Sequence, residues 1–221
     1  MRASIIIPTY NRYPLLHALL VSLVSAIEDT DAEIIVVDDA STDDTTGKLA
    51  IEFPSVRLLA LPRSMGPAYS RNRGAEAASG RLLLFLDSDG VVEAEWRDAL
   101  LTADTGTHLL LGNVVDFRSG RRQSVPRRAT FIGKSLPCPP ERANTGPSCN
   151  LAVPRDIFEA LGGFDEELPY YFEDSDLCIR AARAGHPFKF VADAVFRHHG
   201  TERKTGEAIR LQEAHSTYAL L

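Results

Sequence analysis

The chain has 221 residues, 44% hydrophobic and 24% charged, a composition that excludes a disordered or collagen-like protein and predicts one globular domain over residues 1–221. The formal net charge of −6 argues against a nucleic-acid partner, because neutralising phosphates needs a basic face. The cysteines Cys138, Cys149 and Cys178 form no CxxC pair, so the sequence indicates neither a disulfide framework nor a zinc ribbon. The apolar run 15–27 is too short for a bilayer. We therefore expect a cytoplasmic protein without a transmembrane segment, and peripheral contact with a membrane stays open.

The first half of the chain alternates short apolar runs with helical periods. Strands are predicted at 4–8, 33–38, 56–60 and 81–86, and helices at 15–27, after 41–44 and at about 68–78. This alternation predicts an α/β fold: a Rossmann-like, mostly parallel central sheet with helices on both faces.

The second half is less regular. It contains a predicted strand at 108–117, an apolar segment at 149–153, helices at about 155–161 and 173–184, and an apolar stretch at 188–196. Between them, residues 118–142 form a predicted long loop with several prolines, many basic residues and no acid until Glu141. This segment is either a solvated loop or an anion clamp over a bound diphosphate. No linker divides the chain.

Polar residues follow three of the predicted strands. They are the segment 9–12, the pair Asp38-Asp39, and the triplet Asp87-Ser88-Asp89. Ligands of open parallel sheets bind outside the carboxyl ends of the strands, and two alternating carboxylates can hold a hard divalent cation. An isolated acidic strand end is more often a cap or a turn, but three polar strand ends in one sheet favour a ligand site.

Acidic residues also open the helix predicted at 173–184. In the simpler interpretation they complement the helix dipole, and Asp176 pairs with Arg180 four residues later. In the alternative, one carboxylate faces a cleft as a general base. The neighbouring histidines His198 and His199 are either surface or core residues, or contribute one metal ligand.

The ordered set of these motifs resembles the inverting family 2 glycosyltransferases of the GT-A fold. The matching pieces are 4–12, 34–43, Gly66 with 71–74, 85–90, 162–166, and 173–177 with Arg180. Each motif alone is weak, but they occur in the order of the family and cover the chain to about residue 200. The resemblance divides the domain into a nucleotide-binding half at about 1–90, an acceptor and catalytic half at about 91–200, and a C-terminal helical segment at 201–221.

The resemblance implies roles for individual residues. Asp174 matches the general base, and Asp89 with His198, which fits slightly better than His199, matches the ligands of Mn²⁺ or Mg²⁺. The residues implied to bind the nucleotide are Pro8, Tyr10, Arg12, Asp39, Arg71 and Asp87, the last as a ribose or metal contact. The implied reaction moves a sugar from a nucleotide-diphosphate donor, with UDP or dTDP favoured, to a hydroxyl of a glycan, lipid-linked or small-molecule acceptor.

Three other functions are compatible with parts of the pattern. A catalytically inactive sugar-nucleotide-binding domain would keep every ligand without turnover. A haloacid-dehalogenase-type phosphatase would use Asp87 as its nucleophile, although no later Gly-Asp-x-x-x-Asp follows. A receiver-like signalling domain would use Asp38 and Asp39 as its acidic pocket, but a complete strand-helix unit precedes them and the domain would be much shorter.

Overall fold

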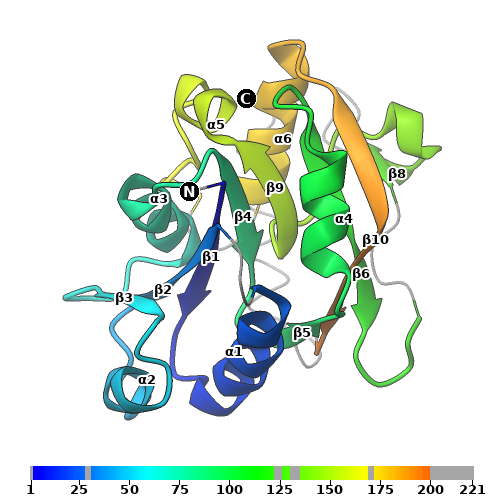
Figure 1. The fold of residues 1–221 in the computed structure, drawn as a ribbon. Helices are drawn as coiled ribbons and strands as arrows, with labels where there is room; N and C mark the ends of the chain where they lie inside the picture. Colours follow the sequence, from blue (N-terminus) through cyan, green and yellow to red (C-terminus); the bar gives the residue numbers. More distant parts are fainter. Residues whose placement is uncertain (1, 28–30, 122–125, 130–134, 169–171, 200–221) are drawn as a thin grey trace, which may run out of the picture.

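The computed structural model describes residues 2–27, 31–121, 126–129, 135–168 and 172–199. An eight-stranded sheet runs through the centre of the molecule (Figure 1). In spatial order its strands are β3 (Arg57–Ala60), β2 (Ala32–Asp38), β1 (Ala3–Thr9), β4 (Leu82–Leu86), β9 (Asn150–Pro154), β6 (Leu109–Asp116), β10 (Phe188–His198) and β5 (Gly90–Val92). The predicted helical segment 201–221 lies outside the described residues.

Most neighbouring strands are parallel, as predicted. Parallel pairs join β3 to β2, β2 to β1, β1 to β4, and β6 to β10. The exceptions are β9, which runs antiparallel between β4 and β6, and β5, which runs antiparallel to the end of β10. The apolar segment predicted at 149–153 is thus a central strand of reversed direction.

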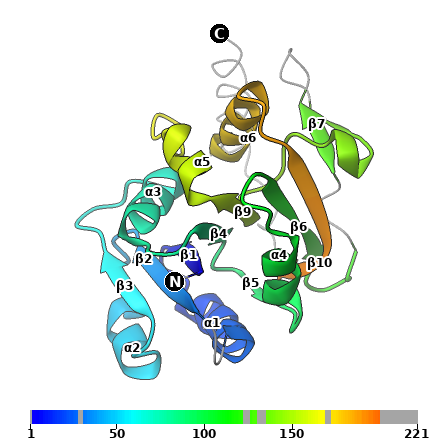
Figure 2. The same cartoon turned by 45° about the horizontal axis from the view of Figure 1, so that its top comes forward.

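Helices cover both faces of the sheet, because alternate residues of each buried strand point to opposite sides. On β1, Ile5 and Ile7 pack in the cluster that contains the buried residues of α1 (Tyr13–Ile27), α2 (Thr45–Glu52) and α4 (Trp96–Ala103). Ile6 packs in the other cluster, with α3 (Pro67–Ala77), α5 (Arg155–Ala160) and α6 (Glu173–Arg183). Figure 2 shows these two sets of helices on the two sides of the sheet.

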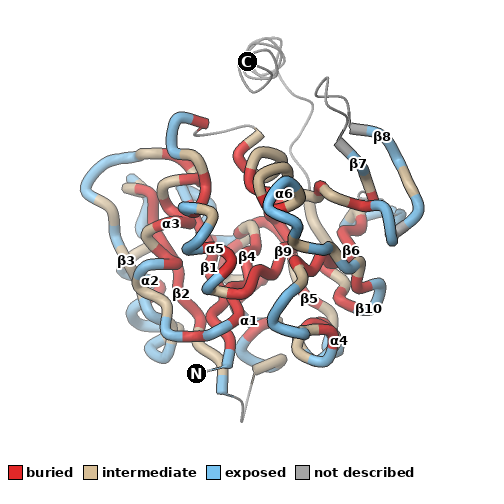
Figure 3. Tube along the Cα trace, turned by 90° about the horizontal axis from the view of Figure 1, so that it is seen from above, coloured by how far each residue is buried: buried red, intermediate tan, exposed pale blue. Residues whose placement is uncertain are grey.

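The core lies along the central strands, where the buried residues of Figure 3 concentrate. The helix predicted at 15–27 is confirmed in α1: its Leu16, Leu19, Leu20 and Leu23 are fully buried, whereas Val24 is 38% exposed. Each such side chain contributes about 1.5–3 kcal/mol by leaving water. No helix among the described residues has the length and apolar character needed to cross a bilayer.

Several elements were not predicted. Strand β5 and helix α4 follow β4 directly. The described parts of the predicted loop 118–142 contain a two-stranded antiparallel sheet of β7 (Arg127–Ala129) and β8 (Ser135–Pro137), and a 3₁₀ helix, η1 (Pro140–Arg142). The prediction of a plain loop is wrong there. Strands of three residues are too short for a hydrophobic period to reveal them.

Candidate active site

The loop after β1 is tied to the loop after β2. Asn11 has a φ of 50°, and its Oδ1 accepts hydrogen bonds from the backbone nitrogens of Thr42 at 2.7 Å and Asp43 at 3.2 Å. The carbonyl of Arg12 accepts from Leu15 N and Leu16 N, both at 3.0 Å, in the first turn of α1. These bonds fix the backbone of Arg12 and leave its side chain to reach across the carboxyl ends of the strands.

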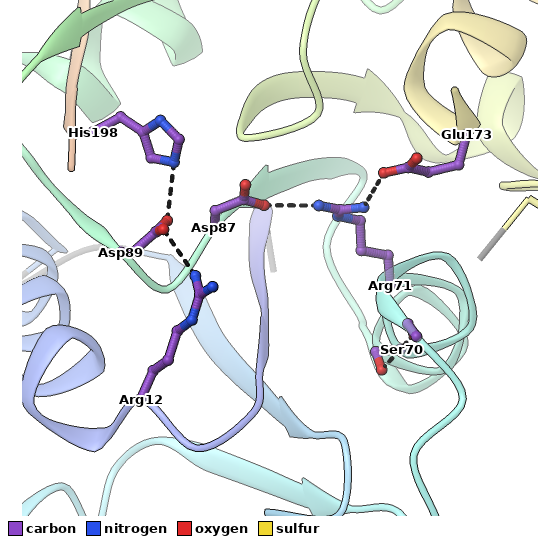
Figure 4. A network of polar contacts seen from close by, with 8 residues as sticks. Arg12, Ser70, Arg71, Asp87, Asp89, Glu173 and His198 are labelled. Atoms are coloured by element: carbon purple, nitrogen blue, oxygen red, sulfur yellow. Dashed lines mark hydrogen bonds and ion pairs between the residues drawn. The ribbon is translucent and has the colours of Figure 1, made fainter. Parts of the chain in front are cut away.

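Asp89 lies at the centre of this edge (Figure 4). Its side chain is 6% exposed, and its two oxygens lie 2.8 Å from Arg12 Nη1 and 2.9 Å from His198 Nε2. Burial opposes ionisation, but the hydrogen bond from His198 and the charges of His198 and Arg12 outweigh it and hold the pKa of Asp89 below its ordinary value. The carboxylate is therefore ionised and can bind a cation.

Asp87, Asp89 and His198 can each offer a ligand atom, and these atoms lie within 4.8 Å of one another. Carboxylate oxygens with one imidazole nitrogen suit Mn²⁺, and the carboxylates alone suit Mg²⁺, so the donors fit the predicted ion. His199 instead stacks on Phe117, with ring centroids 3.8 Å apart, while its backbone nitrogen donates to the Asp89 carbonyl at 2.8 Å. Among the described residues, His198 is thus the histidine that joins the carboxylates.

Gly90 follows the acidic triplet because the chain has no room for a side chain there. A Cβ at this position would lie 2.5 Å from the carbonyl oxygen of Arg197 and 2.4 Å from the ring of Phe196. The antiparallel register of β5 on β10 pairs Gly90 with His198. This close approach brings His198 beside Asp89, although the two are 109 residues apart.

Arg71 connects the acidic strand end to α6. Its side chain, 4% exposed, places Nη2 2.7 Å from Asp87 Oδ1 and Nη1 2.9 Å from Glu173 Oε1. The two carboxylates raise the pKa of Arg71 against the opposing effect of burial, so the guanidinium is a fixed positive charge. The resemblance implies a nucleotide contact for Arg71, and the geometry adds a role as the bridge between Asp87 and Glu173.

Glu173 belongs to the acidic start of the helix predicted at 173–184, but the sequence did not single it out as a site residue. Burial and the charge of Asp174 raise the pKa of Glu173 to about 7 despite Arg71. Burial likewise raises the pKa of Asp174, against hydrogen bonds from the backbone nitrogens of Ser175, at 2.6 Å, and Ser148. The predicted pair of Asp176 with Arg180 forms at 2.6 Å, which leaves Asp174 without that structural partner.

The remaining predicted nucleotide residues lie around this edge. Asp39 accepts hydrogen bonds from Met65 N at 2.8 Å, Gly66 N at 3.0 Å and Ser64 Oγ at 2.7 Å, and so holds the loop that leads into α3. Pro8 pairs with Val37 in the buried part of β1. Tyr10 is 47% exposed.

Asn72 and Arg180 hold the turn before α6 from two sides. Asn72 Nδ2 donates to the Phe164 carbonyl at 2.8 Å, and Phe164 N donates to Asn72 Oδ1 at 2.9 Å. Arg180 donates to the carbonyls of Leu161 at 2.6 Å and Gly163 at 2.8 Å. Gly163 has a φ of 74°, and a Cβ there would lie 2.7 Å from Asn72 Oδ1, so the turn requires glycine.

Comparisons with known proteins agree with the predicted resemblance. The model of glycosyl transferase family 2 matches residues 4–162. The glycosyltransferase AglE of Haloferax volcanii is 27% identical over 215 residues, which are 95% of this chain and 70% of AglE. This chain spans only 19–42% of three further curated relatives.

Solved structures share the fold. GalNAc-T7, solved with UDP, GalNAc and Mn²⁺, has a TM-score of 0.75 at 19% identity, over 90% of this chain and 44% of that one. The mannosyltransferase PcManGT from Pyrobaculum calidifontis, solved with GDP-Man and Mn²⁺, has a TM-score of 0.71 at 24% identity, over 91% of this chain and 58% of that one. The predicted GT-A fold is confirmed.

Proposed function

Because the chain belongs to glycosyl transferase family 2, we propose that it is an inverting enzyme that moves a sugar from a nucleotide diphosphate to an acceptor hydroxyl. One observation carries the proposal. A single edge of the sheet gathers three residues that could hold a cation and, across the Arg71 bridge, a pair of carboxyl groups with raised pKa values. A phosphatase or a receiver needs no such second acidic centre.

Asp87, Asp89 and His198 would hold Mn²⁺ or Mg²⁺. When bound there, the ion supplies positive charge to the diphosphate of the donor, which stabilises it as a leaving group. Arg12, whose side chain is half-exposed at the same carboxylate, is placed to add a hydrogen bond to a phosphate oxygen.

Tyr10 and Asp39 would contact the base of the nucleotide. A carboxylate has about four acceptor positions, and Asp39 uses three of them on the loop before α3. The fourth can accept the N3 hydrogen of uracil or thymine, so we favour UDP or dTDP as the nucleotide. The structural neighbours were solved with different nucleotides, UDP in one and GDP-Man in the other. The fold therefore does not determine which nucleotide is bound.

Asp174 would act as the general base. Its carboxylate would take the proton of the acceptor hydroxyl as that oxygen attacks the anomeric carbon from the side opposite the diphosphate. The bond to the diphosphate breaks in the same step, so the anomeric centre inverts without a covalent intermediate. A pKa raised toward neutrality improves a carboxylate as a base at physiological pH.

The acceptor would enter beside the end of β6. Phe117 stacks on His199 next to the cation site, and the exposed basic residues Arg118 and Arg121 lie in the turn that follows. We assign acceptor selection to this part of the segment 118–142. A glycan, a lipid-linked sugar and a small molecule all remain candidate acceptors.

The decisive experiment compares Asp174→Asn with the matched variant Asp176→Asn, two residues later on α6. We expect Asp174→Asn to keep its affinity for UDP and Mn²⁺ in calorimetry and to lose about 10²- to 10⁴-fold in single-turnover transfer. Asp176→Asn breaks only the pair with Arg180 and should keep most transfer activity.

Two outcomes would contradict the assignment. Full activity of Asp174→Asn would remove this residue from the chemistry. A wild-type protein that binds nucleotide but neither hydrolyses nor transfers any sugar-nucleotide donor would be an inactive binding domain.

A further inference from the structure

We propose that Arg12 is an internal counter-ion that occupies Asp89 in the ligand-free protein and competes with the divalent cation for this carboxylate. The inference rests on the proposed cation site. It assigns Arg12 two successive partners: Asp89 before the ion binds, and a phosphate of the donor afterwards.

The first argument is the contrast between the two arginines of the site. Both pair with a carboxylate of the Asp87-Ser88-Asp89 triplet, at 2.7 Å for Arg71 and 2.8 Å for Arg12. The Arg71 side chain is 4% exposed and also pairs with Glu173, whereas the Arg12 side chain is 46% exposed. Arg71 is therefore a permanent part of the interior, while the half-exposed guanidinium of Arg12 can return to water once a cation takes its place at Asp89.

The second argument is that the buried carboxylate of Asp89 needs a positively charged partner. Arg12 Nη1 and His198 Nε2 lie against its two oxygens, and the side chain is 6% exposed. A buried, ionised carboxylate needs a compensating partner in the absence of a cation. A divalent ion placed among Asp87, Asp89 and His198 would face the guanidinium at the same carboxylate, and the two positive charges would repel each other.

The third argument is where Arg12 can go. Hydrogen bonds of Asn11 and of the Arg12 carbonyl hold the backbone in place, so only the side chain needs to move. Its half-exposed position at the rim of the cation site is within reach of a diphosphate bound to that ion. The guanidinium would then form charge-assisted hydrogen bonds with phosphate oxygens.

This exchange predicts effects of opposite sign in one variant. Arg12→Gln should bind Mn²⁺ alone about three- to tenfold more tightly than the wild type, because the competing charge is gone. With Mn²⁺ present, the same variant should bind UDP about tenfold more weakly, because the phosphate contact is lost. Arg12→Lys keeps a positive charge and should lie between the wild type and Arg12→Gln in both measurements.

Arg197→Gln is the matched control for charge. Arg197 is 41% exposed and pairs with Glu93 at 2.5 Å, next to His198 in sequence but on the opposite face of β10. This variant also removes one positive charge from an ion pair near the site, without touching Asp89. We expect its affinity for Mn²⁺ to stay within twofold of the wild type.

Mn²⁺ binding is measured by electron paramagnetic resonance of the free ion, and UDP binding by calorimetry, after melting curves show that each variant is folded. Unchanged Mn²⁺ affinity in Arg12→Gln, or equal tightening in Arg12→Gln and Arg197→Gln, would overturn the competition and leave the proposed function standing. Absence of Mn²⁺ binding in every variant and in the wild type would overturn both.

Discussion

Glu173 and Asp174 are neighbours in sequence that share one low-dielectric environment. The groups that face them are Arg71 from α3, Asp87 beyond it on the strand end, and the buried thiol of Cys149, whose pKa is raised well above its ordinary value so that it stays neutral. Two carboxylates this close titrate as a pair. Loss of the second proton from the pair thus belongs near pH 7, where burial places Glu173.

We expect transfer activity to depend on this titration. The base works as a carboxylate, so kcat/KM should rise as Asp174 ionises, at a pH above the ordinary range of an aspartate because burial raises the pKa of Asp174. Ionisation of Glu173 near pH 7 then adds a negative charge beside the base, so the wild-type profile should change again there, and Glu173→Gln, which cannot ionise, should lack this second change. The pH dependence of kcat/KM for both proteins tests this.

Asp176→Asn is the control for the pH profile, because Asp176 is already paired with Arg180. Its acidic limb should match that of the wild type. If Glu173→Gln also matched the wild type, Glu173 would not influence the base.

At the scale of elements, helix α3 joins the nucleotide half to the catalytic half. Four consecutive residues of this helix, 71–74, make different contacts. Arg71 reaches Asp87 and Glu173, Asn72 reaches the turn at Phe164, and Arg73 lies at the surface near Glu76. Gly74 lets the helix approach the sheet, since a Cβ there would lie 2.4 Å from Ile6 Cγ2. The motif 71–74 therefore sets how α3, β1 and the turn before α6 fit together.

Asn72→Ala should cost about 1–3 kcal/mol of unfolding free energy, because it leaves the buried amide and carbonyl of Phe164 without their hydrogen-bond partner. Arg73→Ala, one residue later, breaks partly exposed pairs with Glu76 and Glu166 and should cost less than about 1 kcal/mol. Urea unfolding of both variants with unchanged m-values gives the comparison. Equal losses would show that the Asn72 contacts do not hold the turn.

In the molecule as a whole, the site joins residues that are far apart in the sequence. Asp89 meets His198 across 109 residues, and Arg71 meets Glu173 across 102. A ligand at this edge touches both halves, so its binding free energy should stabilise the whole fold rather than one segment.

UDP with Mn²⁺ at about 100 times the dissociation constant should stabilise the protein by about 2.7 kcal/mol, which raises Tm by roughly 5–10 °C for a domain of this size. EDTA should remove most of this shift, and Asp89→Asn should abolish its metal-dependent part. Differential scanning calorimetry with and without EDTA measures both. A shift that survives EDTA unchanged would contradict a metal-assisted donor site.

Features that depend on neighbouring residues could be predicted from the sequence. Apolar runs and helical periods revealed the four strands of the first half and their parallel sheet, and the polar strand ends located Asp39, Asp87 and Asp89 at one edge. The pairing of Asp176 with Arg180 followed from their spacing on one helix. In each case the physical cause lies within a few residues, in the period of a strand or helix or in the chemistry of a turn.

The contacts between distant side chains could not be predicted in this way and are known from the structure. It placed His198 rather than His199 at the carboxylates, set Arg12 on Asp89, and inserted Arg71 between Asp87 and Glu173. It also shows that β9 runs antiparallel to its neighbours and that the unpredicted strand β5 pairs with β10. The register of this pair at Gly90 brings His198 to the site. These contacts depend on strand order and on the direction of each crossing, which arise from packing the whole chain around its core and leave no local period in the sequence.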